Sequence, residues 1–83
     1  MELIELTIED VIKNGEEYNY IGQQFFVKTK YRQSWRSAFL YPELVYDDDL
    51  NEYSWYYEFE FEDDITEHLD INAKYIEHIC IIK

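Results

Sequence analysis

The chain has 83 residues, of which 47% are hydrophobic and 19% aromatic, enough for one small domain with an aromatic-rich core and too few for two domains. Nineteen acidic against seven basic residues give a formal net charge of −12, which disfavours direct binding to nucleic acid or to an anionic membrane. The single cysteine, Cys80, excludes an internal disulfide and is typical of a reducing compartment, so we expect a cytoplasmic protein.

The N-terminal third predicts one helix and one strand. Thr7 can cap a helix that carries Glu9 and Asp10 in its first turn, where acidic side chains are favoured. The Asn-Gly pair at residues 14–15 is expected to end this helix. Residues 18–21 then suggest a first strand, which breaks near Gly22.

The middle of the chain predicts two more strands and a turn. Residues 25–32 alternate between apolar and basic side chains, as a half-buried strand does. A further strand over residues 35–41 is expected to end at Pro42, because proline cannot donate to a strand ladder. The acidic residues 47–51 predict a turn.

The strongest pattern lies in residues 53–62. Aromatic residues occupy the odd positions 53–61, and strict alternation of this kind indicates a β-strand with one buried face. We therefore expect an aromatic ladder in the core. The opposite face carries an evenly spaced acidic row, made of Glu58, Glu60 and Glu62.

The remaining residues predict a helix over 64–70, capped by Asp64, and a C-terminal strand over 75–82. The C-terminal strand is expected in the centre of the sheet rather than at its edge. The fold class is therefore α+β: a single domain over residues 1–83, with an antiparallel sheet of four to five strands and one or two short helices.

The charge is concentrated in one segment. Residues 43–70 contain twelve acidic residues and no Lys or Arg, whereas the rest of the chain has seven of each sign. A charge block of this kind is often disordered, but here aromatic residues are interleaved with it. The segment therefore predicts a folded acidic surface.

Metal sites and catalysis have weak support. The spacing of Asp47, Asp49, Asn51 and Glu58 matches part of a calcium-binding EF-hand loop, but Glu52 stands where that loop needs glycine. The two histidines and Cys80 match no common zinc spacing. The chain has no phosphate-binding loop, serine-hydrolase elbow or zinc-protease motif. We expect no metal, no cofactor and no enzymatic activity.

The basic strand face offers two alternatives. A face with Phe26, Lys28, Lys30 and Arg32 can bind single-stranded nucleic acid, which the net charge of −12 opposes. The other interpretation is that these cations pair with the acidic row on a neighbouring strand, which would neutralise it.

Three explanations compete for the acidic surface. It can serve solubility alone, or it can belong to a structural protein that self-associates through a sheet edge. The third is an inhibitor whose carboxylates take the places of phosphates in the cationic groove of a nucleic-acid-binding protein. Solubility alone does not account for the confinement of the net charge to one segment.

The run Asp47-Asp48-Asp49, the acidic row with Asp63 and Asp64, and the aromatics between them resemble phage-encoded DNA mimics, including many small anti-CRISPR proteins. The resemblance covers residues 43–70 and lies in size, composition and charge layout. It implies a stoichiometric, non-enzymatic blocker of a CRISPR effector or another nuclease in the host cytoplasm. Immunity proteins that neutralise nuclease toxins have similar composition and are the alternative. The predicted partner-binding residues are Asp47, Asp48, Asp49, Glu52, Tyr56, Glu58, Glu60, Glu62, Asp63, Asp64 and Glu67.

Overall fold

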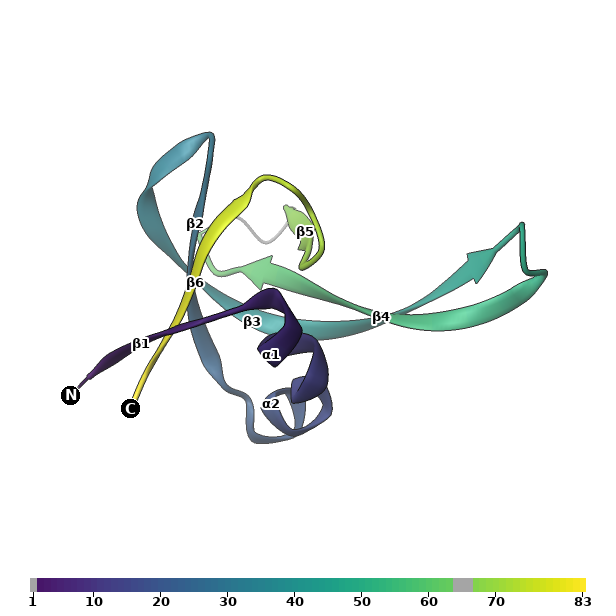
Figure 1. The fold of residues 1–83 in the computed structure, drawn as a ribbon, viewed down its shortest axis with the longest axis horizontal. Coiled ribbons are helices and arrows are strands. Elements are labelled where there is room, and N and C mark those ends of the chain that lie inside the picture. The colour runs from purple at the N-terminus through teal and green to yellow at the C-terminus, as the bar shows by residue number, and fades with distance from the viewer. Residues whose placement is uncertain (1, 64–66) are drawn as a thin grey trace.

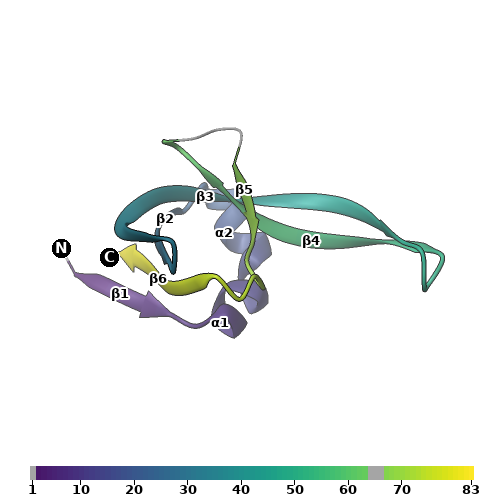
Figure 2. The same ribbon diagram turned by 90° about the horizontal axis from the view of Figure 1, so that it is seen from above.

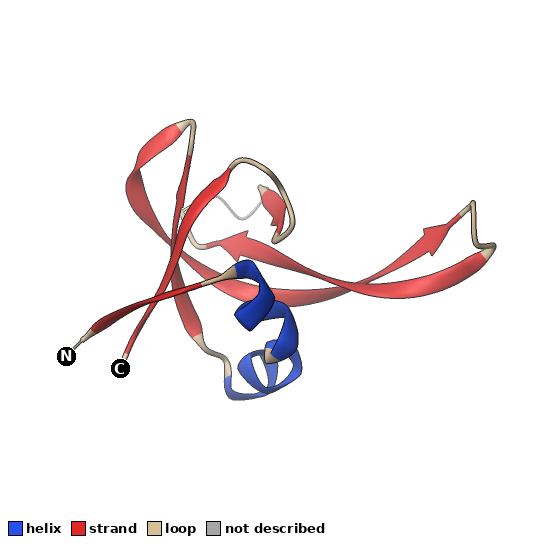
Figure 3. Cartoon of the chain, in the orientation of Figure 1, coloured by secondary structure: helices blue, strands red, loops and turns tan. Residues whose placement is uncertain are grey.

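The computed structural model describes residues 2–63 and 67–83 as an α+β domain (Figures 1 and 3). The strands and helices follow in the order β1 (Leu3–Leu6), α1 (Ile8–Lys13), α2 (Gly15–Ile21), β2 (Gln24–Thr29), β3 (Arg32–Asp47), β4 (Glu52–Phe61), β5 (His68–Asp70) and β6 (Ile76–Ile82). Neither described helix has the length and apolar character that a bilayer crossing requires.

The strands form one antiparallel sheet in the order β1-β6-β2-β3-β4-β5. The α+β class and the antiparallel sheet are confirmed, with six strands in the described residues rather than four or five. β1 was not predicted; it pairs with β6 from Leu3↔Ile82 to Leu6↔Ile79. This pairing places β6 inside the sheet, between β1 and β2 rather than at an edge, as expected, and residues 79–81 are buried.

The first helix begins as predicted. Thr7 and Asp10 form a capping box, in which each side chain accepts a hydrogen bond from the other residue's backbone N–H. The backbone bond that Thr7 donates lowers the pKa of Asp10. Stability from this carboxylate is therefore present above its unfolded pKa and is lost on acidification.

The predicted strand over residues 18–21 is wrong, because these residues belong to helix α2. Gly15 starts this second helix instead of only ending the first, and Gly22 ends it in the left-handed conformation at φ 66°. The helix places Tyr18 edge-on against Phe25 at 5.3 Å between ring centroids. Packing against this core ring accounts for a helix where local β-propensity favours a strand.

The core collects the inward side chains of the sheet, one residue of α1 and Ile71 from the turn after β5. β2 alternates as predicted, with Phe25, Val27 and Thr29 buried, although Tyr31 lies in the following turn and is exposed. Phe25 packs edge-on against Phe59 at 5.2 Å. The buried hydrophobic cluster consists of Val11, Phe25, Val27, Ala38, Leu40, Phe59, Phe61, Ile71, Ile79 and Ile81.

Two further boundaries differ from the prediction. β3 continues through Pro42 to Asp47, since its pairing with β2 has already ended at Gln24↔Phe39 and Pro42 needs no ladder hydrogen bond on that free edge. The predicted helix over 64–70 is wrong at its described end, where residues 68–70 form β5 along β4. Its predicted cap, Asp64, lies outside the described residues.

Replacing Phe59 with alanine should lower the free energy of unfolding by about 3–5 kcal/mol, because the ring is fully buried and leaves a cavity. Tyr53→Ala is the matched control, since Tyr53 lies on the same strand face but is 66% exposed. Urea unfolding followed by circular dichroism measures both. Equal losses for the two variants would contradict the assigned core.

Gly15→Ala should destabilise the protein by about 1–3 kcal/mol, although the same change usually stabilises a helix. A Cβ at residue 15 would lie 2.8 Å from Cε2 of Tyr57. This distance is too short for helix α2 to keep its position against the Tyr57 ring. The same substitution in a Tyr57→Leu background should cost less, because the clashing ring is gone. A stabilising effect of Gly15→Ala on the natural sequence, measured by urea unfolding, would refute this contact.

Candidate functional site: an acidic hairpin arm

The β3–β4 hairpin extends beyond the rest of the sheet as an arm (Figures 1 and 2). The two strands pair from Ala38↔Phe61 to Asp47↔Glu52. The pairing of β2 with β3 does not extend beyond Phe39, and β5 pairs with β4 only at residues 58–60. Residues 43–56 are therefore a two-stranded ribbon with two free edges. We call this segment the arm.

The tip of the arm is an ordered turn. The Asp47 carboxylate accepts hydrogen bonds from the backbone N–H groups of Asp49 at 2.9 Å and Leu50 at 3.3 Å. Asn51 adopts a positive φ of 53°, and the hydroxyl of Tyr46 donates to its side-chain oxygen. Asp47 is the last residue of β3, and the predicted turn is confirmed over residues 48–51. Its strand flanks also differ from the helices of an EF-hand.

Both faces of the arm are accessible, which corrects the predicted aromatic ladder. Phe59 and Phe61 are buried as expected, but Tyr53 and Trp55 are 66% and 67% exposed. They continue the core face of β4 beyond the point where the buried cluster ends. Opposite them on β3, Leu44 pairs with Trp55 and Tyr46 pairs with Tyr53, so the exposed apolar face spans both strands.

The other face of the arm brings much of the predicted site together. An open hollow of about 560 Å³ is lined by Asp47, Asp48, Asp49, Tyr56 and Glu58, with Val45 and Asp70 completing its wall. Tyr46, which pairs with Tyr53 on the apolar face, also contributes to the lining. Five predicted partner-binding residues therefore share one surface. Glu52 lies opposite Asp47 at the tip. The sequence did not single out Asp70, which reaches the hollow because β5 pairs it with Glu58.

Glu58 lies in crowded acidic surroundings at the base of the hollow. Partial burial raises the pKa of its carboxyl, and the hydrogen bond with Glu43 and the negative charges of Glu43 and Asp70 raise it further. His68 acts in the opposite direction, with its Nδ1 at 3.7 Å from Oε2 of Glu58. Near neutral pH this group concentrates negative charge, which a cationic ligand would relieve.

The rest of the predicted row is less uniform. Glu60 faces the same side as Glu58 and lies between Phe39 and His68, whereas Glu62 lies past the end of β4 and accepts a hydrogen bond from Gln24 at 3.2 Å. The row therefore holds two residues on the strand rather than three.

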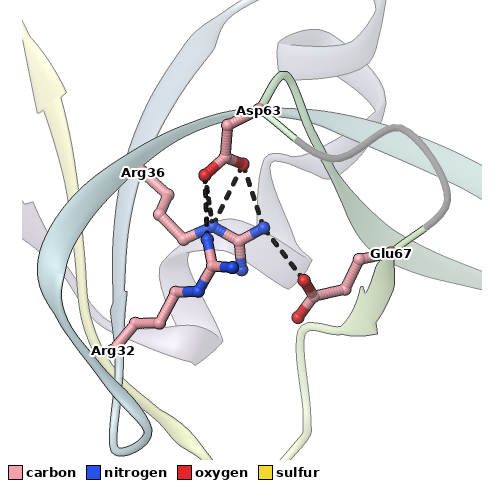
Figure 4. Close-up of polar contacts among 4 residues, drawn as sticks. All are labelled: Arg32, Arg36, Asp63 and Glu67. Atoms are coloured by element: carbon pink, nitrogen blue, oxygen red, sulfur yellow. Dashed lines mark hydrogen bonds and ion pairs between the residues drawn. The ribbon is translucent and has the colours of Figure 1, made fainter.

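Asp63 and Glu67 have a different environment at the opposite end of β4 (Figure 4). The side chain of Arg36 is 2% exposed and donates to both Asp63 oxygens, at 2.9–3.1 Å, and to Glu67 at 3.0 Å. Arg32 adds a bond to Asp63 at 3.0 Å, and the Arg36 guanidinium lies 3.9 Å from the centroid of the Phe61 ring. These two acids close a structural ion-pair cluster.

The pKa values at this cluster reflect the pairing. Hydrogen bonding to Arg36 lowers the pKa of Asp63. Burial alone would lower the pKa of Arg36, but its bonds to Asp63 and Glu67 raise it overall. The expected pairing of the basic face with Glu58, Glu60 and Glu62 is not what the described contacts show. β3 separates β2, which carries Lys28, from β4, and Arg32 begins β3 instead of continuing β2. The two arginines bind Asp63 and Glu67 instead.

The described residues contain no group of three His, Cys, Asp or Glu side chains placed to hold a metal ion. His78 contacts Glu5 at 2.5 Å, and His68 lies near Glu58, so each histidine has an acidic neighbour. Burial, with a smaller contribution from the charge of Glu5, raises the pKa of Cys80 and thereby suppresses its nucleophilic thiolate.

Comparison of the chain with protein-family models, with curated proteins and with solved structures finds no match.

Glu58→Gln should raise the thermal midpoint at pH 7 and lose this advantage below about pH 4. A folded-state pKa above the unfolded value means that ionising Glu58 costs stability; the cost is absent below the unfolded pKa and complete above the folded one. Glu60→Gln, on the same strand face, controls for the lower net charge. An equal gain for both variants at pH 7 would contradict the crowded environment of Glu58.

Proposed function

We propose that this chain is a non-enzymatic inhibitor whose acidic arm occupies the nucleic-acid-binding site of a cationic partner protein, such as a CRISPR effector or another nuclease. The observation that carries the proposal is the composition of a projecting arm. Residues 43–56 hold five acidic residues and no Lys or Arg, and the arm stands out from the domain where a groove can receive it (Figure 2).

The arm has the chemistry that a phosphate-binding groove recognises. Carboxylates accept paired hydrogen bonds from arginine, as phosphates do. Side chains that share a strand face lie at multiples of about 6.5–7 Å, so Glu43 and Asp47 on β3, and Glu58 and Glu60 on β4, are held at fixed spacings. The Asp47 carboxylate holds the tip in one conformation, which reduces the entropy lost on binding.

The predicted partner-binding residues at the arm and at Arg36 form a contact set and a structural set, while Glu60 and Glu62 lie between them and remain predicted contacts. The tip residues Asp48, Asp49 and Glu52 and the hollow residues Asp47, Tyr56 and Glu58 form the proposed contact surface. Asp63 and Glu67 are held by Arg36, so they stabilise the fold rather than bind the partner. An immunity protein against a nuclease toxin would use the same surface, and the two alternatives differ in the identity of the target.

The first test is capture of the target from nuclease-treated host lysate on the immobilised protein, at about 0.1 M salt and then at about 0.5 M salt. We expect one dominant nucleic-acid-binding protein, which added duplex DNA or RNA releases. Binding should weaken at the higher salt, because screening shortens the reach of surface charges.

Matched variants assign the binding to the arm. Asp48→Asn with Asp49→Asn should reduce capture at least tenfold, whereas Glu9→Gln with Glu77→Gln, which removes the same charge from exposed sites outside the arm, should not. Capture that nucleic acid fails to displace, or that both double variants weaken equally, would refute the proposed mode of inhibition.

A further inference from the structure

A cleft separates the base of the arm from helix α2. Its volume is about 430 Å³, and its lining residues are Glu16, Asn19, Pro42, Trp55 and Tyr57. The hollow described above shares none of these lining residues, and most of its strand residues lie on the opposite strand face. The cleft is therefore a second site at the root of the arm.

The walls of this cleft are held in place by contacts between α2 and the sheet. Gly15 starts α2 directly against the ring of Tyr57, with no room for a Cβ. One turn further on, the side-chain amide of Asn19 donates to the backbone oxygen of Leu40 at 3.0 Å. These two contacts fix the helix on β3 and β4, so the cleft is formed before any ligand binds.

The lining combines an exposed indole with a carboxylate. Trp55 is 67% exposed, unusual for the largest apolar side chain, and Glu16 is an exposed residue of the first turn of α2. No Lys or Arg lines the cleft. An aromatic face beside an exposed carboxylate is the environment that a guanidinium group prefers, because it can stack on the ring while it donates to the acid.

We propose that this cleft receives an arginine side chain of the cationic partner. The guanidinium stacks on Trp55 and pairs with Glu16, while its methylene stem lies on Pro42 and Tyr57. The inference rests on the proposed function for the source of the arginine. An arginine bound in this cleft would explain why the arm exposes an apolar face as well as an acidic one: the arm offers charge on one side and an aromatic anchor on the other.

A second copy of this chain is a poor source of that arginine. Its only arginines, Arg32 and Arg36, both pair with Asp63, and two chains of charge −12 repel each other. Lysine is the weaker candidate because its compact, strongly hydrated ammonium does not stack as a planar guanidinium does. An arginine from a groove that normally binds phosphates fits both the lining and the charge.

The test is a titration with N-acetyl-arginine amide followed by the two indole N–H resonances in ¹H–¹⁵N NMR spectra. Trp35 lies on β3 beside Lys28 and His78 and serves as the internal control. A Trp35→Phe variant assigns the peaks. We expect a saturable shift of the Trp55 resonance, little shift of Trp35, and weaker binding of N-acetyl-lysine amide.

Glu16→Gln should weaken the arginine probe about twofold to fivefold, the range expected for one exposed ion pair. Glu17→Gln removes the same charge from the same helical turn without touching the cleft and should leave the affinity unchanged. Equal shifts of both indoles, no shift of Trp55, or equal losses in both variants would overturn the proposal. The titration with the arginine probe needs no partner protein. If nucleic acid failed to displace the captured target, the proposed function would be refuted, but the arginine site would not be.

Discussion

The pairing of Leu40 with Phe59 is the constraint on which the rest of the structure depends. Side chains alternate strictly along a strand, so this single register decides the face of every residue from the core to the tip of the hairpin. It points both residues inward and turns Tyr41 and Glu58 outward. Carried beyond the core, the same alternation leaves Trp55 on a face with nothing to bury it.

The acidic residues of segment 43–70 differ in whether they contact Arg36. At one end of β4, Asp63 and Glu67 enclose the buried guanidinium, which would be costly to desolvate alone. At the other end, the arm has no basic residue within the same ribbon, and Glu58 and Glu43 crowd each other. The arm is thus where carboxylates have no Lys or Arg in the same ribbon, and where an external cation would gain most.

Some of this arrangement follows from the sequence and some does not. Period-two alternation correctly predicts the buried face of β2 as far as Thr29, although not the turn that ends it, and the buried Phe59 and Phe61, because burial and strand geometry leave a local pattern. Exposure of Trp55 has no such signature, since the alternation is the same whether or not another element covers the face. The α2 helix was missed for a related reason: Tyr18 takes its conformation from its contact with Phe25, a tertiary effect. The grouping of Asp70 with Glu58 likewise depends on β5, which only the sheet topology reveals.

The most direct test of the central claim is hydrogen–deuterium exchange of the complex between this protein and its captured target. The account predicts new protection of residues 43–56 in this chain and of the nucleic-acid-binding surface in the target. These free ribbon edges exchange readily when alone, so protection there is easily seen. Protection confined to β1 or β6, with the arm still exchanging freely, would contradict the account.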